Sequence, residues 1–60
     1  MSKKQKDTRA AIIDAACQLF SEHGYDAVST RMITNKANVA HSAIYYHFET
    51  KDQLYTEVFR

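Results

Sequence analysis

Closely spaced helix-boundary signals in the second half of the chain constrain its fold more than any other feature. Ser29 is a good N-cap, and Val28 and Ile33 stand at the N′ and N4 positions of a hydrophobic staple. These signals predict a short helix over 30–37. The helix ends at Asn38, because asparagine is, after glycine, the residue that best tolerates a positive φ.

A second short helix follows that turn at once. Val39 and Ile44 have the spacing of another hydrophobic staple around Ala40, which predicts a helix over 41–47. Ala40 is a weak N-cap, because it has no side-chain oxygen for the helix amides and leaves them to water or to a phosphate oxygen. Two short helices joined by a tight turn form a helix-turn-helix.

The last helix is predicted to begin at Lys51. Thr50 and Gln53 form a capping box of T-x-x-Q type, and Leu54 and Val58 give the helix a core side. Its pattern runs to the final residue without a termination signal. We therefore expect these 60 residues to be the first part of a longer protein.

The first long periodic segment is also helical. Its apolar residues recur at three- and four-residue spacing, at Ile12, Ala16, Leu19 and Phe20. Gly24, the chain's only glycine, can adopt the left-handed conformation of a C′ residue and ends the helix after His23. Cys17 flanks the apolar stripe and is expected to be a small buried residue. The predicted fold class is all-α.

Length and composition exclude several classes of protein. Sixty residues allow one small domain, and 25% charged residues without proline argue against a disordered linker. There is no apolar run of the ~20 residues that a membrane span needs, and no signal peptide, so a cytoplasmic location is the default expectation. A nucleophile with its base, a carboxylate pair and a phosphate-binding loop are all missing, so we expect neither an enzyme nor a cofactor.

The charge is unevenly distributed, although the net charge is only +1. The N-terminal segment is basic and the predicted first helix is acidic. The basic residues of the N-terminal segment are Lys3, Lys4, Lys6 and Arg9. This distribution fits a one-sided electrostatic footprint for non-specific attraction to DNA. Charge alone favours a solvated tail and a mixed surface, because basic N-terminal tails are common.

The helix over 41–47 has an unusual outer face. Ile44 and Phe48 lie on one side at i and i+4 and are predicted to face the core. Polar and aromatic side chains are left pointing outward, namely His41, Ser42, Tyr45 and Tyr46. Such a face indicates a binding partner, which can be DNA or, as the alternative, a protein docked on a small helical interaction module through tyrosine anchors.

Taken together, these motifs resemble the DNA-binding domain of the tetracycline-repressor (TetR) family. The resemblance rests on the I-x-x-A-A-x-x-L-F helix over 12–20, Gly24-Tyr25, a Ser-Thr helix start, and Y-Y-H-F followed by Lys51 and Leu54. It implies a three-helix, homeodomain-like helix-turn-helix bundle plus the start of a fourth helix. The implied domain covers 9–60, after a basic arm over 1–8. The departures from the usual family pattern are Thr34, Asn38, Ala40 and Ser42.

Physical reasoning and the resemblance predict the same DNA contacts. The helix over 41–47 would enter the major groove, with base contacts from His41, Ser42 and Tyr46 and an apolar contact of Ala43 with a thymine methyl. Phosphate contacts are expected at helix starts, from Thr30 and Lys51. By resemblance, Tyr45 also contacts a phosphate.

The resemblance further implies features beyond this chain. Family members are typically homodimeric repressors that are released from palindromic operators when a small molecule binds a C-terminal helical domain. The expected partners are therefore double-stranded DNA, a second copy of the protein joined through that domain, and a small-molecule effector of the full-length protein.

Overall fold

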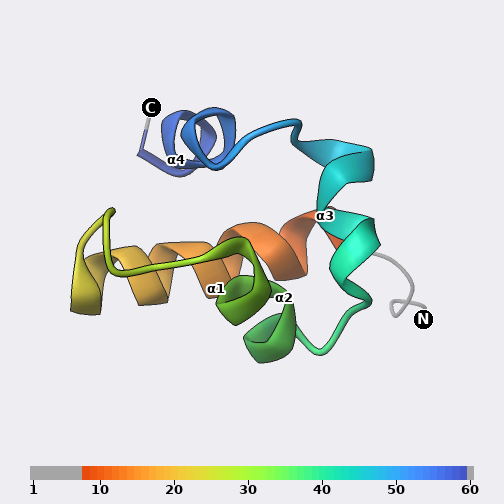
Figure 1. Ribbon diagram of the computed structural model, residues 1–60, viewed down its shortest axis with the longest axis horizontal. Coiled ribbons are helices and arrows are strands. Elements are labelled where there is room, and N and C mark those ends of the chain that lie inside the picture. The colour runs from red at the N-terminus through yellow and green to blue at the C-terminus, as the bar shows by residue number, and fades with distance from the viewer. Residues whose placement is uncertain (1–7, 60) are drawn as a thin grey trace.

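The computed structural model describes residues 8–59, and this part of the chain is all-helical. The helices are α1 (Thr8–His23), α2 (Thr30–Ala37), α3 (His41–His47) and α4 (Lys51–Phe59) (Figure 1). The predicted fold class is thus confirmed, as are the bounds of α2 and α3. Helix α1 begins one residue before the expected start of the domain. No helix in residues 8–59 combines the length and apolarity needed to cross a membrane.

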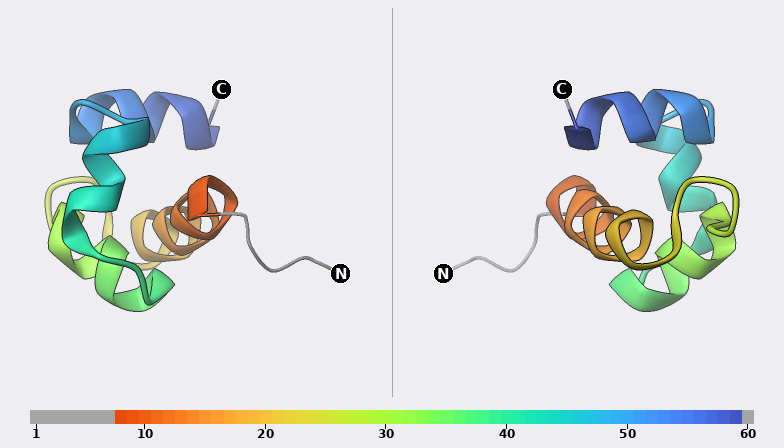
Figure 2. Two further views of the ribbon diagram at one scale, coloured as in Figure 1. Left: turned by 90° about the vertical axis from the view of Figure 1, so that its right-hand side faces the viewer. Right: turned by 90° about the vertical axis from the view of Figure 1, so that its left-hand side faces the viewer.

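Helix α1 is the central element of the bundle. Helices α2 and α4 lie on opposite sides of it, and α3 crosses beside its N-terminal half (Figures 1 and 2). All four helices contribute to one apolar core, which consists of Ile12, Ala15, Ala16, Leu19, Phe20, Val28, Ile33, Ile44, Phe48 and Leu54. Burial of these residues supplies the main favourable term in folding.

The turn between α2 and α3 is a Schellman motif. Asn38 adopts the left-handed conformation (φ 62°, ψ 45°), as predicted. Its amide donates to Asn35 O at 3.2 Å, and the Val39 amide donates to Thr34 O at 3.0 Å. Ala40 makes no side-chain capping bond to α3, which confirms it as a weak N-cap.

The end of α1 and the start of α4 also have the conformations that the sequence predicts. Gly24 has φ 87° and donates its amide to Phe20 O at 2.9 Å, and the next ring, of Tyr25, stacks on Phe20 at 5.9 Å. At the start of α4, the Gln53 amide donates to Thr50 Oγ1 at 3.0 Å. The Gln53 side chain accepts from the amide of Glu49, one residue earlier than in the standard capping box.

The burial predicted for Cys17 is wrong, because this residue is exposed. The buried stripe of α1 includes Ala15 as well as Ile12, Ala16, Leu19 and Phe20. At 3.6 residues per turn, Cys17 lies about 130° around the helix from the middle of that stripe. The sequence pattern placed the stripe too far toward Cys17 because alanine is a weak marker of burial, so the contribution of Ala15 was missed.

Candidate nucleic-acid interface

Helix α3 presents the outer face that its sequence predicts. Ile44 is buried, while Tyr45 and Tyr46 are 50% and 86% exposed. Ser42 is also exposed, and His41 and Ala43 are partly buried. An almost fully exposed tyrosine on a seven-residue helix contributes little to the domain's own core, so its ring and hydroxyl are available to a partner.

One hydroxyl joins α2 to α3 at the edge of this face. Thr30 Oγ1 lies 3.0 Å from His41 Nε2 and 3.2 Å from the Tyr45 hydroxyl. The His41 and Tyr45 rings also pack edge to face, with centroids 5.3 Å apart. Ser29 caps α2 by accepting the Met32 amide at 3.2 Å, which holds Thr30 at the first helical position.

This arrangement brings together three residues that were predicted separately. Thr30 and Tyr45 were expected at phosphates and His41 at a base edge, and the structure places the three in one hydrogen-bonded group. Hydroxyl and imidazole groups can both donate to phosphate oxygens. The two hydroxyls are therefore chemically suited to a phosphate beside α3, and the His41 ring lies next to them.

Lys51 has partners inside the protein. Its Nζ donates to Tyr25 O and to Val28 O, both at 2.9 Å, and lies 4.1 Å from the centroid of the Tyr25 ring. The Tyr25 hydroxyl in turn donates to the Asp52 carboxylate. An ammonium carries three N–H groups, and the two carbonyls use two of them.

The basic N-terminal residues are only partly described. Lys3, Lys4 and Lys6 lie outside residues 8–59. Arg9 belongs to α1, where it forms an ion pair with Glu57 of α4 at 3.0 Å and lies 5.4 Å from the Phe48 ring centroid. Its guanidinium thus contacts α4 and the end of α3 rather than extending from an arm.

Two features of the site were missed by the sequence reasoning. Arg31 is exposed directly after Thr30, and its position in the first turn of α2 was the available signal. The contact of Asp52 with Tyr25 had no local signal, because the two residues lie 27 positions apart.

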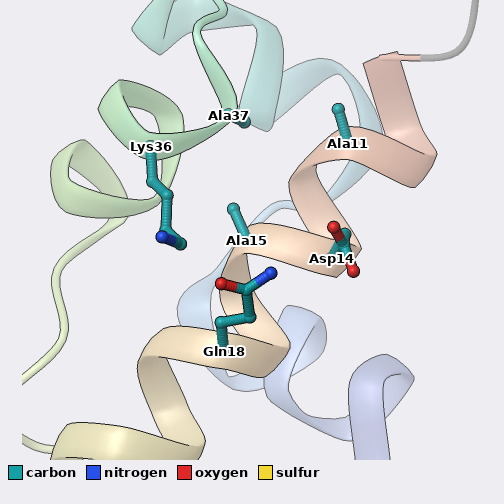
Figure 3. Close-up of a pocket in the computed structure, with 6 residues that line it drawn as sticks. All are labelled: Ala11, Asp14, Ala15, Gln18, Lys36 and Ala37. Carbon is teal, nitrogen blue, oxygen red and sulfur yellow. The ribbon is translucent and has the colours of Figure 1, made fainter.

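A groove of about 290 Å³ lies between α1 and α2, apart from these residues. It is lined by Ala11, Asp14, Ala15, Gln18, Lys36 and Ala37 (Figure 3). None of the predicted DNA contacts lines it. Among residues 8–59 there is also no cluster of three or more His, Cys, Asp or Glu side chains that could hold a metal ion.

The chain matches the model of the family described as bacterial regulatory proteins, tetR family, over residues 12–58. It is 39% identical to the HTH-type transcriptional regulator AcrR of Shigella flexneri, over 97% of this chain and 29% of that protein. It is 43% identical to the HTH-type transcriptional repressor Rv3405c of Mycobacterium tuberculosis, over 90% of this chain and 29% of that protein.

A solved structure shows the same fold. A crystal structure assigned to the tetR family of transcription regulators, from Shewanella sp. PV-4, superposes with a TM-score of 0.86 and is 35% identical in sequence. The match covers 90% of this chain and 29% of that one. The chain thus spans less than a third of the length of these relatives. The helix-turn-helix geometry, the sequence match and the structural match agree. The chain belongs to the TetR family and corresponds to the family's N-terminal helix-turn-helix domain.

Proposed function

We propose that this chain is the operator-reading domain of a transcriptional regulator and binds double-stranded DNA in a sequence-specific way. The observation that carries the proposal is the outer face of α3, where Ser42 and Tyr46 are exposed and the Tyr45 hydroxyl pairs with that of Thr30. The relatives named as transcriptional regulators and repressors support it. They favour it over a protein-docking module and over an enzyme.

In this proposal α3 enters the major groove, where each base pair presents a distinct pattern of donors and acceptors. His41, Ser42 and Tyr46 contact base edges, and Ala43 packs on a thymine methyl. Their side chains project from one short helix, which is the geometry of a recognition helix.

Phosphate contacts hold α3 in register. Thr30 and Tyr45 donate their hydroxyls to the backbone on one side of the groove, and the remaining N–H of Lys51 donates to it near the start of α4. Lys3, Lys4, Lys6 and Arg9 add sequence-independent attraction. Phosphate contacts fix the position of the protein, whereas base contacts supply specificity.

We propose that the full-length protein has the general properties of its family. It would be a cytoplasmic homodimer that binds a palindromic operator and is released by a small molecule bound to a C-terminal domain. One relative, the negative transcriptional regulator IcaR of Staphylococcus epidermidis, is 41% identical over 73% of this chain. IcaR is named as a negative regulator and Rv3405c as a repressor, and both names support repression rather than activation.

Selection of bound duplexes from a randomised pool, followed by salt titration, tests the proposal. A sequence preference should emerge, and log K for the selected duplex should fall linearly with log salt, with a slope of about −0.9 per phosphate contact. A random duplex should bind more weakly, by a factor on the order of 10³ or more for a complete dimer and less for this domain alone. Binding without a sequence preference, or without salt dependence, would contradict the proposal.

A further inference from the structure

The N-terminal half of α4 contacts the turn between α1 and α2. Lys51 contributes the two carbonyl bonds, to Tyr25 O and Val28 O, and lies over the Tyr25 ring. Asp52 accepts the Tyr25 hydroxyl, and Tyr55 packs edge to face on the same ring at 5.1 Å. The ring and the hydroxyl of one tyrosine are thus both contacted by residues of a single helix.

The held segment leads directly into α2. Val28 O, which accepts from Lys51, is the carbonyl immediately before Ser29, the N-cap of α2. Thr30 follows at the first helical position. Because the N-cap sets the direction in which a helix starts, a shift of the Val28 carbonyl changes the placement of the Thr30 hydroxyl.

We propose that Lys51 is a positioning residue for the Thr30 phosphate contact. Its ammonium ties the α1–α2 turn to α4 and so holds the Thr30 hydroxyl beside Tyr45. This inference rests on the proposed function, and it adds an indirect role to the direct phosphate contact proposed for the same ammonium. A cation at a helix start is disfavoured by the helix dipole, and here the two carbonyl oxygens and the Tyr25 ring compensate the ammonium of Lys51.

The indirect role has a distinctive energetic consequence. If Lys51 acts partly through Thr30, removing the ammonium is more harmful when the Thr30 hydroxyl is present than when it is absent. A purely direct contact with a separate phosphate would instead give additive effects, as independent sites do. The salt slope reports the direct contact, so the two roles can be measured separately.

The test is a double-mutant cycle of Lys51→Met and Thr30→Val, with affinities measured on the duplex that the unmodified chain selects from a randomised pool. Lys51→Met should weaken binding about tenfold or more in the unmodified chain, as expected for a hydrogen bond made by a charged group. In the Thr30→Val background the loss should be smaller by about threefold or more. The matched control is Lys36→Met, which removes a cation from the far end of α2 and should give equal losses in both backgrounds.

Lys51→Arg separates the effect of the positive charge from that of the two carbonyl hydrogen bonds. It keeps the positive charge and therefore the salt slope, but a planar guanidinium on a different stem cannot reproduce one nitrogen between two carbonyl oxygens. The affinity for DNA should fall with little change in the slope of log K against log salt. The non-additivity with Thr30→Val should persist.

Nuclear magnetic resonance of the unbound chain provides a readout that does not depend on DNA. Lys51→Met should shift the amide signals of Ser29 and Thr30 and speed hydrogen exchange of the Met32 and Ile33 amides, which donate to Ser29, whereas Lys36→Met should leave these signals and rates unchanged. An additive cycle, or unchanged Ser29 and Thr30 amides in Lys51→Met, overturns the inference while the proposed function stands. If the unmodified chain binds no duplex, both fall.

Discussion

The hydroxyl oxygens of Thr30 and Tyr45 lie 3.2 Å apart, although the residues are 15 positions apart and belong to different helices. The pair spans the junction between α2 and α3, and His41 extends it, with Nε2 3.0 Å from the same threonine oxygen. Each hydroxyl has one proton, so both can donate to oxygens of one phosphate group when that group replaces the hydrogen bond between them. The spacing therefore gives the proposed backbone contact a defined geometry.

Removal of either hydroxyl should weaken DNA binding without changing its sequence preference. Thr30→Val and Tyr45→Phe each keep the shape of the side chain and delete a donor to a charged acceptor, for an expected loss of about 1.5 to 3 kcal/mol. Fluorescence anisotropy titrations on the selected duplex and on a random duplex measure the effect. Losses confined to the selected duplex would contradict the assignment of these hydroxyls to phosphates.

Tyr46→Ala should affect specificity instead. The side chain is 86% exposed, so the free energy of unfolding should change by less than about 0.5 kcal/mol. Binding to the selected duplex should weaken by about 1 to 3 kcal/mol through relaxed preference at particular base pairs, while random duplex is bound almost as before. Repeating the pool selection with the variant identifies the affected positions. Equal losses on both duplexes would show that Tyr46 does not read bases.

Ala40→Ser should stabilise the domain. Ala40 already has the extended conformation of an N-cap (φ −64°, ψ 143°) but makes no side-chain bond to α3. A serine hydroxyl there can accept one of the first amides of the helix, which is worth about 0.5 to 2 kcal/mol. Urea unfolding followed by circular dichroism measures the gain. The matched control is Ala27→Ser in the α1–α2 turn, which should stay within about 0.5 kcal/mol of the unmodified chain.

Replacing Asn38 by glycine and by alanine should change the free energy of unfolding by different amounts. Asn38→Gly should leave the free energy of unfolding nearly unchanged, because glycine adopts φ 62° without strain. Asn38→Ala should destabilise the domain by about 1 kcal/mol, since a Cβ is disfavoured in that conformation. Asn35→Ala, one turn earlier inside α2, is the control and should be neutral or slightly stabilising on helix propensity. A destabilisation by Asn35→Ala as large as that by Asn38→Ala would argue against a conformational cause.

The local elements of the fold could be predicted because their signals are local. Asn38 ends α2 by its own backbone conformation, Ser29 caps α2 through a bond to Met32, and Thr50 caps α4 through a bond to Gln53. Each of these signals involves residues at most a few positions apart. The exposure of Tyr46 was predictable for the same reason, since it follows from the angle between neighbouring positions on one helix.

Contacts between helices were decided by the tertiary structure. The sequence by itself determined the bounds of α2 and α3, the end of α1, the start of α4, which residues of α3 face outward, and the family. It did not determine that Lys51 binds the carbonyls of Tyr25 and Val28, that His41 meets Thr30, or that Ala15 rather than Cys17 lies in the core. The physical reason is that such pairs depend on how the helices cross and on which side of each helix is covered, and these are set by the packing of the whole apolar core.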